Sequence, residues 1–135
     1  MQITINIVNF QKMKTDIKDR KDIEKLVNLF YSKIKSDDQI GYFFTDIAKV
    51  KWEEHLPKMC DFWENILFSS GNYNGNPMVK HEELNKKSEV SRAHFTHWNL
   101  MFDETVDELF VGKKAEEIKQ RAINISAAMM YKTLG

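Results

Sequence analysis

The sequence predicts an all-α fold, and three observations support that prediction. Apolar residues recur at spacings of three and four along four stretches, residues 19–35, 52–68, 90–110 and 113–132. One strand-like alternation, residues 2–8, has no second such stretch to pair with. The chain has 135 residues and one cysteine, which is enough for one core without disulfides. We therefore expect one helical domain, residues 19–135, after an N-terminal extension, residues 1–18, that is partly disordered or irregular.

The first helix is expected over residues 19–35, with Asp19 as its N-cap. Its buried face would carry Ile23, Leu26, Val27, Phe30 and Ile34. Tyr31 follows Phe30 directly, so its side chain points about 100° away around the helix axis. Asp and Gly residues then end the helix, and the following turn presents Phe44.

The second helix is expected over residues 52–68. Because Pro57 lacks an N–H, we expect it within about the first turn, which sets the helix start near Trp52 or Glu53. A short helix, capped by Asn76 and ending near residue 84, would follow a loop rich in Gly and Asn. His81 lies one turn into that short helix.

Two more helices complete the prediction. Ser88 or Ser91 is expected to cap a long helix that ends near Phe110, with one face formed by Phe95, Trp98, Met101, Phe102, Val106 and Phe110. Gly112 then separates it from a last helix, residues 113–132. The apolar positions of that helix are Ala115, Ile118, Ala122, Ile125 and Met129.

The net charge and the N-terminal sequence indicate which binding partners and which cellular location to expect. Twenty basic and twenty acidic residues cancel, so the overall charge favours neither nucleic acid nor an anionic membrane as a partner. The sequence contains no apolar run of membrane-spanning length and starts without secretory signal features. We therefore expect a cytoplasmic protein, and in a reducing compartment the single Cys60 is expected to be a core residue.

The histidines and acidic residues exclude several kinds of site. The four histidines, at positions 55, 81, 94 and 97, show no i, i+4 pair that would place two metal ligands on one helix face. Pairs of glutamates lie in Lys-rich stretches typical of solvated helix faces. What remains is one histidine on a short helix, a second on the preceding long helix, and many Phe, Met, Tyr and Trp residues. A single imidazole of this kind can hold haem iron, with apolar walls and a few hydrogen-bond donors on the other side; an ordinary helical core is the alternative.

Five segments, in this order along the chain, resemble the truncated haemoglobins of group III: FYSKI (30–34), IGYFF (40–44), WEEHLPKMCDFW (52–63), GNYNGNPMVKH (71–81) and HFTHWNLMF (94–102). The resemblance covers about residues 19–132. It implies a two-over-two helical sandwich around haem b. The residues outside it are mainly the first eighteen.

The resemblance also implies residue roles. His81 corresponds to the proximal ligand of a five-coordinate haem iron, and Tyr31 and Trp98 correspond to distal donors that stabilise a bound diatomic ligand. His55 lies at the distal histidine position. Three roles compete for it, namely a gate to solvent, a direct donor and a sixth iron ligand, and we favour the gate because Tyr31 and Trp98 already supply donors.

The implied haem pocket uses further side chains. Lys58 would pair with a haem propionate, and the wall would contain Phe30, Phe44, Met59, Phe62, Trp63, Met78 and Phe95. His94 and His97 match no ligand position, so we interpret them as structural or surface residues. Two departures from the family concern the distal side: Tyr42 stands where proline is frequent, and the stretch between Phe44 and Trp52 is short.

The function implied by the resemblance is the binding of dioxygen, carbon monoxide, nitric oxide or cyanide by a monomer. A second hypothesis is a haem enzyme with peroxidase-like or nitric-oxide-detoxifying activity, which would need an external reductase. A third hypothesis is a helical interaction module without haem. Slow oxygen release is expected if both Tyr31 and Trp98 donate to the ligand.

Overall fold

The computed structural model describes residues 14–42, 49, 51–71 and 91–134. These residues form four helices: α2, Arg20–Lys35; α3, Trp52–Phe68; α5, Arg92–Leu109; and α6, Lys113–Leu134. The only β feature in the described ranges is an isolated bridge between Thr15 and Phe110. The all-α prediction is confirmed. The expected short helix near residue 81 and the turn that carries Phe44 lie outside the described residues.

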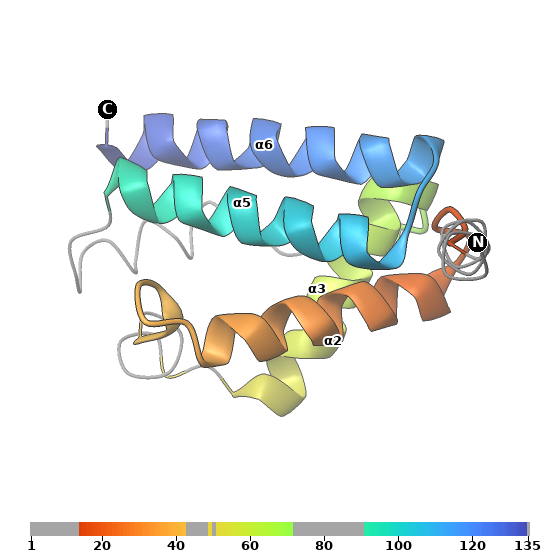
Figure 1. The fold of residues 1–135 in the computed structure, drawn as a ribbon, viewed down its shortest axis with the longest axis horizontal. Coiled ribbons are helices and arrows are strands. Elements are labelled where there is room, and N and C mark those ends of the chain that lie inside the picture. The colour runs from red at the N-terminus through yellow and green to blue at the C-terminus, as the bar shows by residue number, and fades with distance from the viewer. Residues whose placement is uncertain (1–13, 43–48, 50, 72–90, 135) are drawn as a thin grey trace, which may run out of the picture.

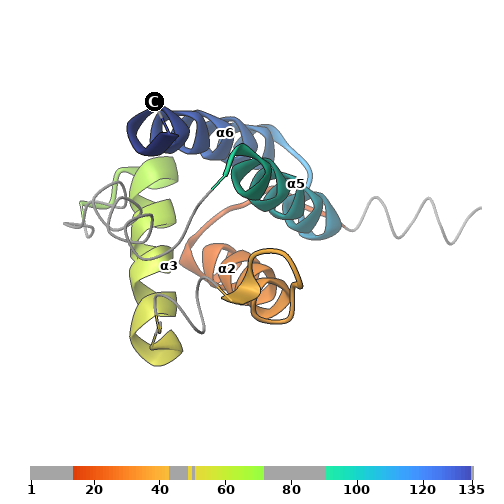
Figure 2. The same cartoon turned by 90° about the vertical axis from the view of Figure 1, so that its left-hand side faces the viewer.

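Helices α2, α5 and α6 run roughly along one direction, and α3 crosses them (Figure 1). Helices α5 and α6 form an antiparallel hairpin around Gly112, and α2 lies beside α5 on the face away from α6. Helix α3 crosses the other three at a steep angle and contacts both α2 and α6, as Figure 2 shows from the end of the bundle. Within the described part of the chain, every helix is too short or too polar to cross a membrane.

The helix starts follow the predicted capping signals. Asp19 is the N-cap of α2, and its carboxylate accepts a hydrogen bond from the N–H of Asp22 at 3.3 Å. Ser91, rather than Ser88, caps α5, and the N–H of Ser91 donates to Nδ1 of His94 at 3.0 Å. His94 thus takes the place that glutamate has in a capping box. His94 therefore has a structural role: its ring completes the cap at the start of α5.

Pro57 corrects one expectation. Helix α3 begins at Trp52, as predicted, but Pro57 is its sixth residue and lies beyond the first turn. A residue at this position would normally donate its N–H to the carbonyl of Glu53, so the proline leaves that carbonyl without a helical donor. The apolar residues of α3 pack against the core on both sides of Pro57, and we infer that this packing offsets the lost hydrogen bond.

The core is built mainly from the predicted apolar faces. All five predicted residues of α2 are at most 1% exposed, and Tyr31 is also buried. Helix α5 contributes Phe102 and Val106, and α6 contributes Ala115, Ile118 and Ala122. Ile125 is half-buried, whereas Ser126 beside it is 2% exposed. The periodicity therefore predicts which face of each helix is buried, with one difference in α6, where Ser126 is more deeply buried than Ile125, whereas Met129 is buried as predicted.

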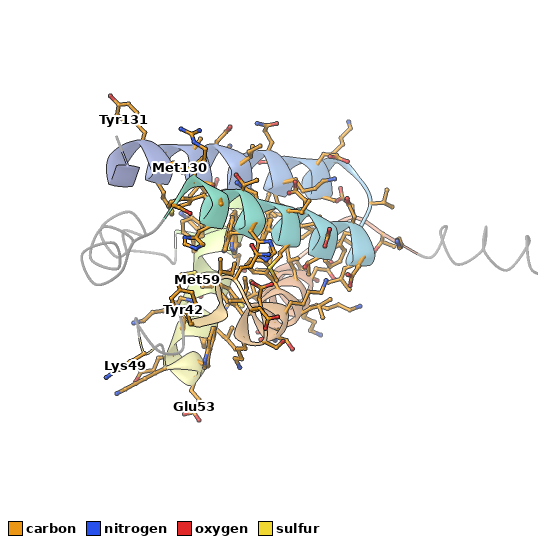
Figure 3. All side chains as sticks on the ribbon, turned by 60° about the vertical axis from the view of Figure 1, so that its left-hand side comes forward. Tyr42, Lys49, Glu53, Met59, Met130 and Tyr131 are labelled. Atoms are coloured by element: carbon orange, nitrogen blue, oxygen red, sulfur yellow. The ribbon has the colours of Figure 1, made fainter. Side chains whose placement is uncertain are left out.

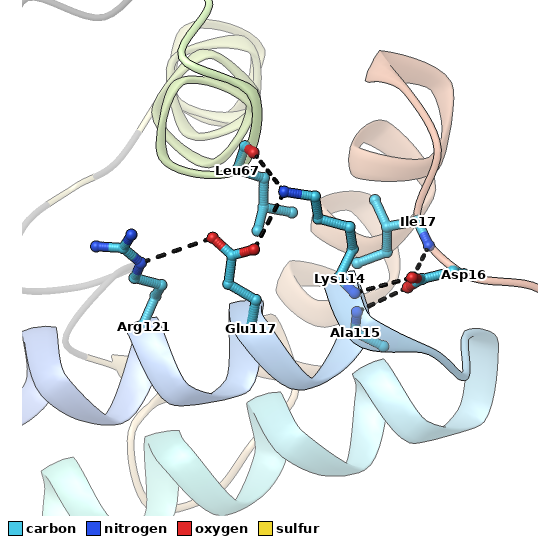
Figure 4. Close-up of polar contacts among 7 residues, drawn as sticks. All are labelled: Asp16, Ile17, Leu67, Lys114, Ala115, Glu117 and Arg121. Atoms are coloured by element: carbon cyan, nitrogen blue, oxygen red, sulfur yellow. Dashed lines mark hydrogen bonds and ion pairs between the residues drawn. The ribbon is translucent and has the colours of Figure 1, made fainter.

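Residues 14–18, part of the segment set apart as an N-terminal extension, contact the α5–α6 corner. Ile17 is 2% exposed and belongs to the core. The Asp16 carboxylate accepts hydrogen bonds from the N–H groups of Ile17, Lys114 and Ala115, each at 2.8 Å (Figure 4). Asp16 therefore caps the first turn of α6 from a distant part of the chain. Gly112 has a positive φ of 144°, and a Cβ there would overlap the Asp16 side chain.

We expect Asp16→Ala to lower the free energy of unfolding by about 1–3 kcal/mol, because two N–H groups of α6 lose their acceptor. Burial alone would raise the pKa of Asp16, but the N–H donors of Lys114, Ala115 and Ile17 bring it below the usual 3.8. The carboxylate therefore stabilises the fold above the usual carboxyl pKa, and this contribution is lost as the pH falls below about 4.

Thermal unfolding of Asp16→Ala at several pH values measures this cap. The difference from the parent protein should be large at neutral pH and should shrink as the pH falls below about 4. Asp38→Ala is the matched control, because Asp38 is exposed and accepts none of the hydrogen bonds found among the described residues. Equal losses in the two variants would contradict the capping role.

Candidate functional site

Tyr31, Trp52 and His55 form one aromatic group between α2 and α3. The rings of Tyr31 and His55 meet edge to face with centroids 5.1 Å apart. Trp52 completes the group, with centroids 5.7 Å from each of the other two rings. Tyr31 is 4% exposed and His55 is half-buried. Two of the three residues predicted for the distal side therefore lie in direct contact.

Phe30 connects this group to Trp98 on α5. Its ring meets those of Tyr31 and Trp98 edge to face, with interplanar angles of 68° and 90° and centroid distances of 5.0 and 5.4 Å. Trp98 also stacks on Phe102 at 5.3 Å, and Phe102 stacks on Trp63 of α3 at 5.0 Å. Such ring contacts stabilise the folded protein by more than the burial of their apolar area alone. The indole of Trp98 is therefore held by a continuous aromatic cluster that includes the neighbour of Tyr31.

Helix α3 has two apolar stripes with different burial. Cys60, Trp63 and Leu67 face the core and are at most 4% exposed. A second stripe, which we call the outer stripe of α3, has His55 at its start and continues at i+4, i+7 and i+11 with Met59, Phe62 and Ile66. All four of its residues are half-buried. In Figure 3, Met59 lies along the same side of the molecule as Tyr42 and Met130.

Two lysines and one thiol lie on or beside these stripes. Lys58 is exposed on α3, as a residue that pairs with a haem propionate would need to be. The Lys35 ammonium lies 4.6 Å from the Trp52 ring centroid, which is a cation–π contact. Burial raises the pKa of the Cys60 thiol to about 11, so at neutral pH it stays protonated on the core side. The expectation that Cys60 is a core residue is confirmed.

The structure separates the predicted wall residues into groups. Met59 and Phe62 lie on the outer stripe of α3, whereas Trp63 faces the core. Phe95 is 6% exposed and lies one turn before Trp98. Three predicted site residues, Phe44, Met78 and His81, lie outside the described residues.

Sequence reasoning missed Trp52, Ile66 and Phe102 as members of the site. Trp52 stands three residues before His55 and Ile66 stands four after Phe62, so helical spacing could have found both. Phe102 was assigned to the core face of its helix, and only the structure shows it stacked between Trp98 and Trp63.

These residues fit haem. A flat apolar group with one polar edge needs a long apolar surface and a few donors near one end. The outer stripe of α3 supplies such a surface through three large apolar side chains that the described residues bury only in part, and the rings of His55 and Tyr31 lie at its start. The described residues contain no group of three or more His, Cys, Asp or Glu side chains that could hold a metal ion.

Three roughly aligned helices crossed by a fourth, with a histidine and large aromatic residues beside a half-buried apolar stripe, are typical of the globin class of protein. No family model matches the chain. The chain is 30% identical over 126 residues to the group 3 truncated haemoglobin ctb of Campylobacter jejuni, covering 89% of this chain and 97% of the relative. The crystal structure of a group III truncated haemoglobin from Campylobacter jejuni superposes with a TM-score of 0.79 at 28% identity, covering 90% of this chain and 95% of that one. The chain belongs to the group III truncated haemoglobins, and it is a haem globin.

Proposed function

We propose that this chain binds b-type haem through His81 and holds dioxygen and other diatomic ligands on the side of Tyr31 and Trp98. The observation that carries the proposal is the convergence of Tyr31, His55 and Trp98 from three helices onto one aromatic cluster. When bound, the haem iron supplies an open coordination position for a diatomic ligand. The protein supplies the proximal imidazole, the distal donors and a dry apolar surface.

The single cysteine supports a haem that is held without covalent attachment. Attachment through thioether bonds uses a C-x-x-C-H motif, and this chain has one cysteine, which lies buried on the core side of α3. Haem would then be retained by axial ligation and by burial of its faces, as in b-type haem proteins. Met59 and Phe62 are the described side chains best placed to cover one face, and Lys58 is exposed for a propionate.

Tyr31 and Trp98 are the proposed hydrogen-bond donors to the diatomic ligand. Both carry a polar hydrogen at the end of a large apolar body, and both are fixed by ring contacts through Phe30. Fixed donors need little reorganisation when a ligand arrives, so they hold it more firmly than mobile ones. We therefore propose slow ligand release, which suits retention of dioxygen better than rapid delivery.

His55 is proposed as the gate. It is the fourth residue of α3, where its backbone N–H bonds to the carbonyl of Lys51 at 2.8 Å. Its half-buried ring contacts Tyr31 and Trp52. A rotation of this one side chain about χ1 would exchange ring contacts for solvent without moving the helix, which is the behaviour that a gate requires.

Titration of haemin into the purified protein tests the proposal. We expect stoichiometric uptake, a sharp Soret band, and a shift of that band when carbon monoxide is added to the reduced protein. The spectra should be recorded in the ferric, ferrous and ferrous-carbonyl forms. A chain that takes up no haem in stoichiometric amount would refute the proposal and leave a helical interaction module as the function.

A further inference from the structure

The corner that follows α2, residues 36–42, is tied to α5 by one side-chain pair. Nε2 of His97 lies 2.8 Å from Oδ1 of Asp37, although the two residues are 60 positions apart in the sequence. The side chains of His97 and Asp37 are only 21% and 16% exposed. His97 is therefore a contact between two parts of the fold and not a solvent-exposed residue.

Asp37 also binds the backbone of this corner through hydrogen bonds. Its Oδ2 accepts hydrogen bonds from the N–H groups of Gln39 and Ile40, both at 3.0 Å. Its carbonyl accepts from the N–H of Gly41 at 3.0 Å, and Ile40 is 3% exposed. Burial would raise the pKa of Asp37, but the bond from His97 and those from the two N–H groups bring it below the usual 3.8. The carboxylate is thus charged at neutral pH.

The pair acts on the turn of α5 that carries Trp98. Trp98 directly follows His97, and its ring contacts Phe30, the neighbour of Tyr31 on α2. A second polar link between α2 and α5 runs from Lys33 to Thr105 and Glu108, about two turns further along α5. His97 is therefore closer to Trp98 along α5 than this second link is.

We propose that Asp37 and His97 are a positioning pair that sets the indole of Trp98 relative to the phenol of Tyr31. The inference rests on the proposed function, in which those two groups are the distal donors. A fixed bond at the α2 corner limits sliding of α5 along α2, and the indole moves with its helix. Because the Asp37 carboxylate can only accept, Nε2 of His97 carries the proton in this bond.

The test compares three substitutions of His97 in the haem-loaded protein. The amide nitrogen of His97→Gln reaches the position of Nε2, whereas His97→Asn is too short and His97→Leu has no donor. The C–O stretching frequency of the ferrous-carbonyl form reports the distal donors. The amide-region NMR resonance of the Trp98 indole N–H, assigned with Trp98→Phe, reports the indole with or without haem. Lys33→Met is the control, because it removes the second polar link between the same helices.

We expect His97→Leu and His97→Asn to shift both signals and to speed dioxygen release several-fold, with His97→Gln close to the parent. Lys33→Met should change thermal stability with little effect on either signal. The inference is overturned if His97→Leu lowers the unfolding temperature but leaves both signals unchanged, because the pair would then be purely structural. If Tyr31→Phe and Trp98→Phe do not move the C–O stretch, the proposed distal donors fail, and the indole resonance alone decides whether the pair positions Trp98.

Discussion

His81→Gly is expected to remove the axial bond to the haem iron. The variant should therefore lose the absorption spectra of the haem-loaded parent protein. The imidazole of His81 is the proposed protein ligand to the iron, and its loss leaves the haem held by contacts with the pocket wall and by the propionate pairing proposed for Lys58. The Soret band should weaken and shift, and bound haem should transfer readily to a competing haem-binding protein. Absorption spectra of the ferric, ferrous and ferrous-carbonyl forms measure the change.

Free imidazole distinguishes loss of a ligand from loss of the fold. The glycine leaves a space for an imidazole molecule, so excess imidazole should restore a spectrum close to that of the parent. His94→Ala is the control, because the His94 ring caps α5 through the N–H of Ser91, and it should retain the parent spectra with reduced stability. Parent-like spectra for His81→Gly without imidazole would mean that another residue holds the iron, and His55 would then be the ligand to substitute next.

Tyr31→Phe is expected to speed dioxygen release about tenfold or more. The substitution removes one O–H donor and keeps the ring that packs against Phe30 and His55. A hydrogen bond to a group with developing charge contributes about 1.5–3 kcal/mol, and each 1.4 kcal/mol is about a factor of ten in rate when association is unchanged. Stopped-flow displacement of dioxygen by carbon monoxide measures the rate.

Carbon monoxide release provides the internal control for Tyr31→Phe. Carbon monoxide accepts hydrogen bonds more weakly than dioxygen, so its release should change much less in this variant. Equal acceleration for both ligands would indicate an opened pocket and would contradict the donor role of Tyr31. Unchanged dioxygen release would place the main donor at Trp98.

Helical periodicity predicted most of the fold. The four described helices begin at residues that capping and spacing predict, and the apolar faces of α2 and α6 are buried almost as expected. The exception is Pro57, which was expected within about the first turn and is the sixth residue of α3. Helical periodicity and capping are thus sufficient where a single apolar face decides which residues of a helix are buried. They are insufficient where tertiary packing offsets a local energetic cost such as a lost backbone hydrogen bond.

The candidate site was predicted less completely, for a physical reason. Tyr31, His55 and Trp98 came from the family resemblance, and the structure brings the first two into contact. The partner of His97 lies 60 residues away, and a contact over that distance leaves no periodic trace in the sequence. The part of the site that depends on His81 lies outside the described residues and stays a prediction.

The cap on α6 has a consequence for the order in which the chain assembles. The Asp16 carboxylate and the N–H groups it binds are separated by 98 and 99 residues. This bond closes only after the intervening helices have brought the two ends together, because so long a loop carries a large closure entropy. We therefore expect the first turn of α6 to be completed late in folding. A bond formed after the rate-limiting barrier mainly slows unfolding, so Asp16→Ala should speed unfolding more than it slows folding.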